Sequence, residues 1–285
     1  MRPGRQRPRH LLHAFRPFEK EARLSRALLK KRLAEGPQVS PFLVLGDPTP
    51  ELSLELAKTA VAAGAGMIEI GFPYGDPVAD GPAIQKADMR ALEAGTSTSK
   101  AIGILARIHE ACPKTPLNLL VYGNLVHARG FARFCHDVVH AGASSLLVPD
   151  ICLEESKPLT KACRRARLGH VQLVGPLTSP ERLKRIDGAA TSFIYLVAHQ
   201  GVTGVRGGDF DDVEALVHRT AWQLKNPLCV GFGLSKPEQI RRVFKAGAGL
   251  AVVGSYLAGV IEQNARGDHL LKAFDEALRP LVDWH

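Results

Sequence analysis

The chain has 285 residues, of which 45% are hydrophobic and 23% are charged, and this is enough to bury one large core in a single domain. Charges, Gly or Pro interrupt every apolar stretch before it reaches the roughly 18 residues of a membrane-spanning helix, so we expect a soluble, cytoplasmic protein. The cysteines lack the paired Cys-x-x-Cys spacing of zinc and redox sites, and we therefore expect no bound metal. They are Cys112, Cys135, Cys152, Cys163 and Cys229.

Positive charge gathers at the N-terminus. The formal net charge is +9, yet residues 1–32 hold eleven Lys or Arg against Glu19 and Glu21, which leaves 26 basic and 26 acidic residues in the rest of the chain. We predict a flexible basic arm over residues 1–19 and one barrel domain over residues 20–285. Such an arm can bind nucleic acid or an acidic partner, or direct targeting. This one lacks the interleaved aromatic residues and the serine richness that those roles favour, so we expect no nucleic-acid partner.

Short β-branched or aliphatic runs alternate with longer amphipathic stretches from about residue 41 onward. This alternation indicates repeated βα units and a parallel sheet. Eight strands are predicted, at Phe42 to Leu45, Met67 to Gly71, Leu117 to Tyr122, Ser145 to Val148, Val171 to Val174, Ser192 to Val197, Leu228 to Gly231 and Ala251 to Val253.

Segments with apolar residues at helical spacing lie between the strands. The clearest are Leu52 to Ala63, Ala83 to Glu93, Ser99 to Ala111, Glu155 to Ala166, Pro237 to Ala246 and His269 to Leu278. Ser179 and Ser235 stand where helix caps are expected, while Gly64, Gly142 and Gly247 stand where helices should end. The recurring Ala-Gly-Ala turn favours an eight-stranded (β/α)8 TIM barrel over a doubly wound sheet. An extra N-terminal helix, roughly Lys20 to Ala34, is expected to close the barrel floor.

Glu69 is the outstanding candidate for chemistry. It alternates with Ile68 and Ile70 on a predicted strand, so its side chain faces either the barrel interior or the helix layer, and both are largely dry. A carboxylate there is costly unless it is paired or used, and burial raises its pKa toward the range of a useful acid or base. A structural carboxylate satisfied by a neighbouring Lys or a backbone amide remains an open alternative.

The loop that follows Glu69 spans residues 71–82 and is rich in Pro and Gly. It holds two more carboxylates, Asp76 and Asp80. Because it is longer than the few residues usual for a βα turn, it favours a binding or lid role over a simple connection.

Glycine-rich loops follow the last three predicted strands. Tyr195 leads into a run that ends in Gly201-Val202-Thr203-Gly204, which resembles a mobile lid. Gly231-Phe232-Gly233 and Gly254-Ser255 end the seventh and eighth strands, where barrels commonly bind phosphate through backbone N–H groups and a helix N-terminus. Tight-turn glycines without a ligand are the alternative, and we favour phosphate binding.

Taken in order, these residues resemble the family of tryptophan synthase alpha subunits, from about residue 20 to the C-terminus. The strongest match is the series Glu69, Gly71, Tyr74, Asp76-Pro77 and Ala79-Asp80-Gly81-Pro82. Supporting matches are Leu45-Gly46-Asp47-Pro48, Tyr122-Gly123-Asn124, Gly201-Val202-Thr203-Gly204, Gly231-Phe232-Gly233 and Gly254-Ser255.

The resemblance implies retro-aldol cleavage of indole-3-glycerol phosphate into indole and glyceraldehyde 3-phosphate. It makes Glu69 the general acid and base, and gives Asp80 the task of holding the indole N–H and stabilising positive charge on the ring. The implied substrate-binding residues are Tyr122, Tyr195, Thr203, Gly204, Phe232, Gly233, Gly254 and Ser255. No cofactor is expected in this chain. Pyridoxal phosphate is expected only in a beta subunit, the implied partner in an alpha2-beta2 assembly.

Four residues depart from the family pattern. Gly75 replaces a Ser or Thr, Val44 stands where many members carry Thr, His199 stands where enteric-type members have Arg, and Cys152 stands where Pro is common. These changes affect the expected lid, phosphate contacts and partner face, but neither catalytic carboxylate. Two alternatives therefore stay open, a stand-alone lyase of the same fold and a degenerate subunit that only activates a beta partner. An isomerase of histidine synthesis would share the late glycines but not the series from Glu69 to Asp80.

Overall fold

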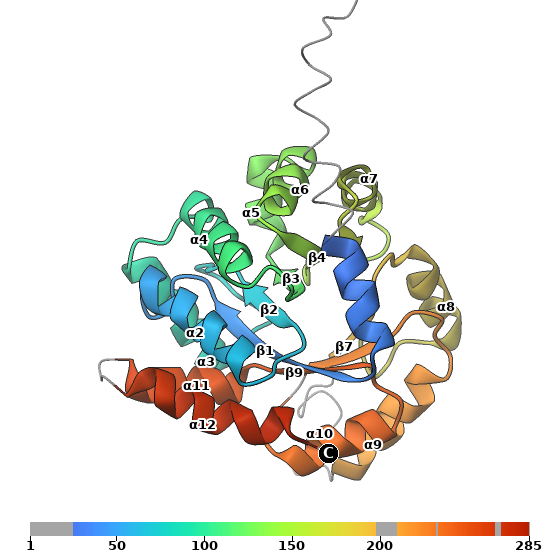
Figure 1. Ribbon diagram of the computed structural model, residues 1–285. Helices are drawn as coiled ribbons and strands as arrows, with labels where there is room; N and C mark the ends of the chain where they lie inside the picture. Colours follow the sequence, from blue (N-terminus) through green and yellow to red (C-terminus); the bar gives the residue numbers. More distant parts are fainter. Residues whose placement is uncertain (1–24, 198–209, 232, 266–268, 285) are drawn as a thin grey trace, which may run out of the picture.

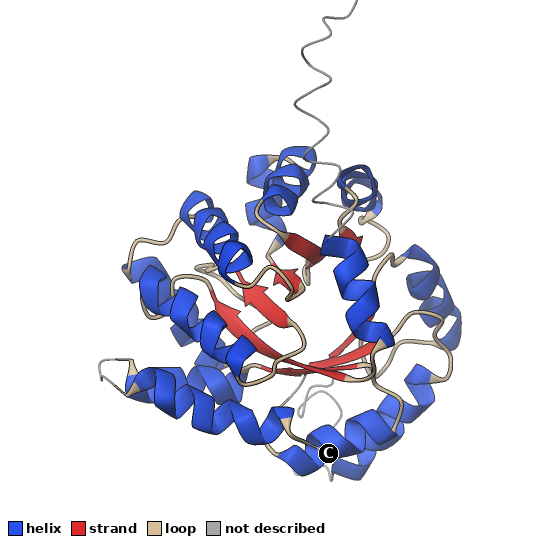
Figure 2. Cartoon of the chain, viewed as in Figure 1, coloured by secondary structure: helices blue, strands red, loops and turns tan. Residues whose placement is uncertain are grey.

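The strands form a ring at the centre of the molecule, and the helices surround it (Figure 1, Figure 2). The computed structural model describes residues 25–197, 210–231, 233–265 and 269–284. All the paired strands are parallel, in the order β5-β4-β3-β2-β1-β9-β8-β7-β6. Their bounds are β1 Gln38–Val44, β2 Ile68–Gly71, β3 Leu117–Leu120, β4 Ala143–Leu147, β5 Gly169–His170, β6 Gln172–Val174, β7 Ile194–Val197, β8 Leu228–Gly231 and β9 Leu250–Val253.

The fifth predicted strand, Val171 to Val174, corresponds to β6, and a two-residue segment, β5, precedes it with only Val171 between them. The segment β5 pairs with β4, and β6 pairs with β7, so the two together connect both ends of the strand order. Gly169 lies close to Ser145 and Ser192, because an added Cβ would be 3.0 Å from each of these side chains. The predicted (β/α)8 barrel is therefore confirmed, with one of its eight strands broken in the middle.

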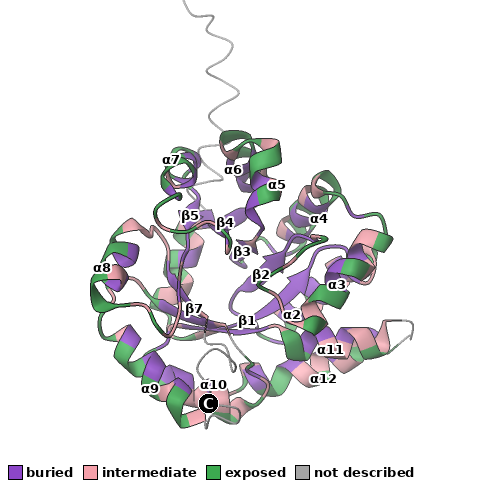
Figure 3. Ribbon diagram, turned by 180° about the vertical axis from the view of Figure 1, so that it is seen from behind, coloured by how far each residue is buried: buried purple, intermediate pink, exposed green. Residues whose placement is uncertain are grey.

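The helices lie on the outside of the ring (Figure 1, Figure 2). Figure 3 shows their buried faces turned toward the barrel and their exposed faces turned outward. Their bounds are α2 Pro50–Ala62, α3 Pro82–Glu93, α4 Thr98–Ala111, α5 Gly123–Arg129, α6 Phe131–His140, α7 Lys157–Ala166, α8 Pro180–Ala189, α9 Phe210–Ala221, α10 Pro237–Lys245, α11 Ser255–Asn264 and α12 Leu270–Val282. None of the helices in the described part of the chain has the length and apolar content needed to cross a membrane.

The helix ends follow the sequence closely. Ser179 caps α8 by accepting a hydrogen bond from the Arg182 backbone N–H, as predicted. Ser235 does not cap α10, which begins after Lys236, and instead the Gln239 side chain accepts the backbone N–H groups of both residues. The recurring Ala-Gly-Ala turn places each central glycine at positive φ, at +100°, +95° and +107° for Gly64, Gly142 and Gly247.

Two apolar clusters build the core. The larger fills the space between the sheet and the helices and includes Ile68 and Ile70. The smaller fills the barrel interior and includes Leu29, which lies on the helix over residues 25–34. The Arg26 guanidinium on the same helix donates to the Thr191 carbonyl at 3.0 Å. This helix closes the barrel floor as predicted, whereas its expected first residues and the basic arm, 1–19, lie outside the described residues.

Candidate active site

The second strand turns Glu69 into the barrel interior. Ile68 and Ile70 pack in the layer between sheet and helices, so the alternation of β2 sends Glu69 the opposite way. Its register partners are Phe42 on β1, which belongs to the interior cluster, and Asn118 on β3. The structure thus decides between the two faces that the sequence left open.

Two hydrogen bonds hold the Glu69 carboxyl group. The Asn118 amide donates to Oε1 at 2.7 Å, and the Tyr195 hydroxyl donates to Oε2 at 3.1 Å. Glu69 is only 1% exposed, and this burial raises its pKa from 4.5 to about 8 although both donors oppose the shift. Among the hydrogen bonds of the described residues, these two side chains satisfy Glu69, and no lysine or backbone amide does so. The catalytic role of Glu69 stays a prediction.

Asp80 lies on the loop between β2 and α3. The Tyr122 hydroxyl donates to its Oδ2 at 2.7 Å, and the Ala79 backbone N–H donates to that same hydroxyl at 3.0 Å. Burial raises the pKa of Asp80 above its usual value, and the hydrogen bond from Tyr122 counteracts part of the rise. The loop therefore holds the second carboxylate in a fixed place.

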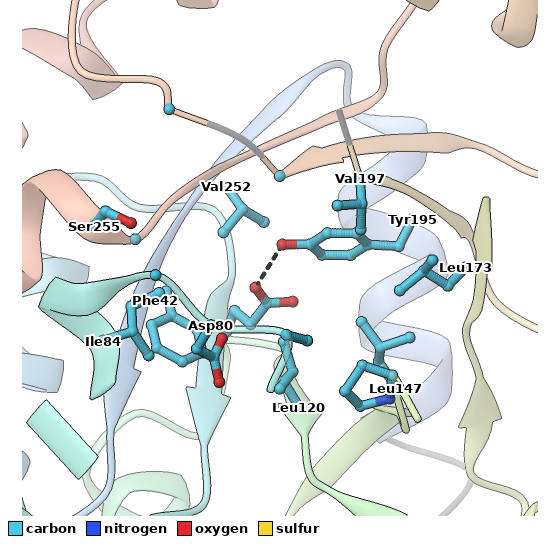
Figure 4. Close-up of a pocket in the computed structure, with 17 residues that line it drawn as sticks. Phe42, Asp80, Ile84, Leu120, Leu147, Leu173, Tyr195, Val197, Val252 and Ser255 are labelled. Atoms are coloured by element: carbon cyan, nitrogen blue, oxygen red, sulfur yellow. Dashed lines mark hydrogen bonds between the residues drawn. The ribbon is translucent and has the colours of Figure 1, made fainter. Parts of the chain in front are cut away.

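Both carboxylates line one cavity of about 380 Å³ at the C-terminal rim of the barrel (Figure 4). Tyr195 lies in the wall of this cavity, and its hydroxyl group bonds to the Glu69 carboxyl group. Most of the wall is apolar, and it is formed by Phe42, Ile84, Leu120, Leu147, Pro149, Leu173, Val197 and Val252. Such a cavity is typical of small-molecule sites, which combine apolar walls with a few placed polar groups.

Backbone groups suited to an anion occupy another part of the same wall. Gly233, Gly254 and Ser255 all line the cavity, and Ser255 begins α11 directly after Gly254. A helix N-terminus presents unpaired N–H groups and a favourable dipole to an anion. The predicted residues Thr203, Gly204 and Phe232, together with the departure His199, lie outside the described residues.

Tyr122 stands apart from the other predicted binding residues. It is 2% exposed, stacks on Tyr74 with ring centroids 5.0 Å apart, and is not among the residues that line the cavity. Its hydroxyl meets Asp80. In this structure it acts on the site through Asp80, while its predicted contact with substrate stays a prediction.

Two strand-end glycines make room for aromatic rings inside the barrel. A Cβ on Gly231 would overlap the Tyr195 hydroxyl, and a Cβ on Gly71 would lie 2.6 Å from Phe42 Cζ. Both aromatic side chains line the cavity. These glycines therefore leave the space that the two aromatic rings occupy in the cavity wall, in addition to any contact with a ligand.

Three departures from the family pattern lie in the described part. Val44 is buried in the barrel interior, where it packs in the apolar cluster. Gly75 is exposed, and nothing lies within 4 Å of a Cβ added to it. The absence of a hydroxyl side chain therefore leaves no gap in the packing. Cys152 is exposed on the loop after β4. None of them hydrogen-bonds to the Glu69 carboxyl group.

Several residues near the site were not singled out from the sequence. Asn118 and Ser145 face the interior on β3 and β4, and the alternation that marked Glu69 could have found them. Asp88 on α3 is 3% exposed, and burial together with the Asp80 charge raises its pKa to about 8. The Tyr74 backbone hydrogen-bonds to Asp88, which links α3 to the loop that carries Asp80. Nothing in the helical pattern of α3 marks this residue.

The raised pKa of Glu69 makes the stability of the fold depend on pH. Between pH 4.5 and about 8 the folded protein keeps a proton on Glu69 that the unfolded chain loses, so the stability falls as pH rises through this window and levels off above it. We expect Glu69→Gln, which stays neutral, to gain stability relative to wild type across the same window. Urea unfolding of both proteins at several pH values measures this. The contribution of Asp88 is the same in both proteins, so it cancels in the difference between their free energies of unfolding. A difference that does not change with pH would contradict the assignment.

Comparisons with known proteins agree with this geometry. The family model of the tryptophan synthase alpha chain matches residues 29–279. The tryptophan synthase alpha chain of Methanothermobacter thermautotrophicus is 40% identical over 233 residues, which cover 82% of this chain and 86% of the relative. That of Prochlorococcus marinus is 41% identical over 236 residues, which cover 83% and 84%.

Solved structures give the same result. The crystal structure of tryptophan synthase subunit alpha from Legionella pneumophila superposes with a TM-score of 0.83 at 28% identity, covering 90% of this chain and 97% of that one. A chain of the tryptophan synthase α2β2 complex from Pyrococcus furiosus superposes with a TM-score of 0.81 at 32% identity, covering 87% and 98%. This chain therefore belongs to the tryptophan synthase alpha chain family.

Proposed function

We propose that this chain is a lyase that cleaves indole-3-glycerol phosphate into indole and glyceraldehyde 3-phosphate, as the alpha subunit of tryptophan synthase. The observation that carries the proposal is the convergence of Glu69 and Asp80 on one apolar cavity of about 380 Å³ at the barrel rim. Family membership sets the reaction class, and the cavity supplies the groups that the reaction needs.

Glu69 supplies both proton transfers of a retro-aldol cleavage. In its neutral form it protonates indole C3, and as the carboxylate it then accepts the proton of the hydroxyl on the adjacent glycerol carbon. The bond between C3 and that carbon breaks, its electron pair returns to the ring, and the hydroxyl carbon becomes the aldehyde. The pKa of about 8 suits this exchange, because a group that both gives and takes a proton works best near the ambient pH.

Asp80 balances the charge that this protonation creates. Adding a proton at C3 places positive charge on the ring nitrogen, and a carboxylate that accepts the N–H hydrogen bond stabilises it. Asp80 lines the cavity while Tyr122 holds its Oδ2. The other carboxylate oxygen is then available to the ring nitrogen.

The phosphate end of the substrate is assigned to the start of α11. Gly254 and Ser255 would bind it together with Gly233, which lies after the neighbouring strand β8, and we retain Thr203, Gly204 and Phe232 as further proposed contacts. Fixing the phosphate places the scissile bond beside Glu69, which lowers the entropic cost of reaching the transition state.

A beta subunit is the proposed partner, and it would hold the pyridoxal phosphate and consume the indole. The Pyrococcus furiosus structure is that of an α2β2 complex. Two exposed apolar side chains lie on loops that follow the strand ends, Val78 after β2 and Leu177 after β6, with 76% and 77% of their surface exposed. They fit a contact face around the cavity mouth. The stand-alone and degenerate alternatives are not favoured, and the paired carboxylates oppose the second of them.

The test is indole release from indole-3-glycerol phosphate by the purified full chain, with and without a beta subunit. We expect indole and glyceraldehyde 3-phosphate in equal amounts, at a rate that rises when the beta subunit is added. Indoleglycerol without the phosphate serves as the control substrate and should react much more slowly. If neither preparation releases indole, the proposed reaction is wrong, and full turnover of the alpha chain alone would favour the stand-alone lyase.

A further inference from the structure

A row of polar side chains crosses three neighbouring strands beneath the cavity. Glu69, Asn118 and Ser145 are register partners on β2, β3 and β4. The Ser145 hydroxyl donates to Asn118 Oδ1 at 2.7 Å, and Asn118 Nδ2 donates to Glu69 Oε1 at 2.7 Å. Asn118 and Ser145 are completely buried, and neither lines the cavity. The row therefore reaches the Glu69 carboxyl group from the packed interior and not from the cavity.

The two oxygens of Glu69 have different surroundings. Oε1 receives the Asn118 amide, which is shielded from the cavity, whereas Oε2 receives Tyr195, whose ring lines the cavity. An amide N–H cannot accept a hydrogen bond, so a proton on Oε1 would face a donor in a dry interior. A tyrosine hydroxyl can donate or accept, so it tolerates a proton on Oε2. The arrangement favours the proton on the cavity side.

Ser145 strengthens this preference by orienting the amide. With its hydroxyl bonded to Oδ1, the amide presents Nδ2 to Glu69. The reversed amide would turn its carbonyl oxygen toward the ionised carboxylate, and two acceptors in contact without a hydrogen are costly when buried. The bond from Ser145 thus supports the orientation that the ionised carboxylate needs.

We propose that Asn118, supported by Ser145, is a positioning residue that keeps Glu69 Oε1 as an acceptor and so directs the exchangeable proton to Oε2, the oxygen on the cavity side. The inference rests on the proposed function only in taking Glu69 as the acid and base. A purely structural reading, in which Asn118 merely satisfies a buried carboxyl group, makes different predictions about pH.

The experiment compares Asn118→Leu with wild type by the pH dependence of kcat and KM for indole release. Because the ionised carboxylate loses a hydrogen-bond donor, the pKa of Glu69 should rise by on the order of one unit. We expect kcat at neutral pH to fall about tenfold, since the proton is no longer confined to one oxygen. KM should change by less than about twofold, because Asn118 does not line the cavity. Ser145→Ala should shift the titration in the same direction by a smaller amount.

A second measurement does not depend on turnover. Carboxyl 13C NMR of glutamate-labelled protein, with the Glu69 signal assigned by its absence in Glu69→Gln, follows the titration directly in the unliganded protein. If Asn118→Leu does not fold, Asn118→Asp takes its place. This change keeps the shape of the side chain but replaces the amide donor with a carboxyl oxygen, so it should raise the pKa of Glu69 further. Gln172→Leu is the matched control, because Gln172 is a buried amide whose hydrogen bonds go to His170.

The outcomes separate the two proposals. If Asn118→Leu lowers kcat by the same factor at every pH and the Glu69 signal titrates as in wild type, or if nothing changes, Asn118 only packs the core and the inference is wrong. If the wild-type protein releases no indole, the proposed function fails, and the NMR titration still decides whether Asn118 controls the carboxyl group.

Discussion

Replacing Glu69 with glutamine is expected to lower the rate of indole release by at least a factor of about 100, the lower range for losing a general acid–base. The amide keeps the size of the carboxyl group and can accept from Asn118 as Oε1 does now. It cannot deliver a proton to indole C3, nor remove the hydroxyl proton of the substrate. We therefore expect a large loss in kcat, measured under saturating substrate, in a protein that folds normally.

The control for this variant is Glu93→Gln, the same change at an exposed position on α3. It should release indole at the wild-type rate. Binding should also survive in Glu69→Gln, because the apolar walls and the start of α11 are unchanged. A Glu69→Gln protein with wild-type turnover would show that another group moves the proton, whereas one that neither folds nor binds would leave Glu69→Asp as the variant to measure.

The barrel could be predicted because its signals are local. Alternating apolar runs gave all eight strands, and turns such as Ala63-Gly64-Ala65 repeat where a helix must return to a strand. The positive φ of Gly64 confirms the physical basis of that signal. The break at Val171 could not be predicted, because it lies between segments that pair with different neighbouring strands, β4 and β7, and such pairing leaves no local signal.

The candidate site could likewise be predicted only in part. Glu69 was recognised from its residue type and its place on a strand, and the family resemblance then singled out Asp80 on the following loop; the structure places both on one cavity. The face that Glu69 occupies could not be derived, because both sides of a barrel strand are dry and alternation alone does not choose between them. The hydrogen bond from Asn118 depends on the register between strands whose bonded residues are 49 positions apart in the sequence, and no local pattern indicates that register.

Asp88 shows a further limit of sequence reasoning. On α3 it reads as an ordinary polar residue, yet it is buried beside the loop that carries Asp80, and the Asp80 charge is the second cause of its raised pKa. Its Oδ2 has no hydrogen-bond partner among the described residues. The electrostatics of the site thus include a third carboxyl group that neither spacing nor the family pattern indicated.

Replacing Asp80 with asparagine is expected to slow indole release by about 100-fold, the scale for losing one group that stabilises transition-state charge. The change removes the negative charge that would face the ring nitrogen, while its carbonyl oxygen can still accept from Tyr122, as Asp80 Oδ2 does now. The loss should appear mainly in kcat, because positive charge on the nitrogen develops only as C3 takes its proton. Asp212→Asn, at an exposed position on α9, is the matched control.

A substrate methylated on the ring nitrogen tests the contact itself. With wild type the methyl group removes the N–H that Asp80 would accept, so this substrate should react slowly. With Asp80→Asn the hydrogen bond to the carboxylate is already lost, so methylation should cost much less than it does in wild type, and the two losses should not multiply. Fully multiplicative losses would show that Asp80 acts elsewhere. Tyr122→Phe would then separate a role of Asp80 in holding the loop from a role at the ring, because this change removes the hydroxyl that bonds both Asp80 and the Ala79 N–H.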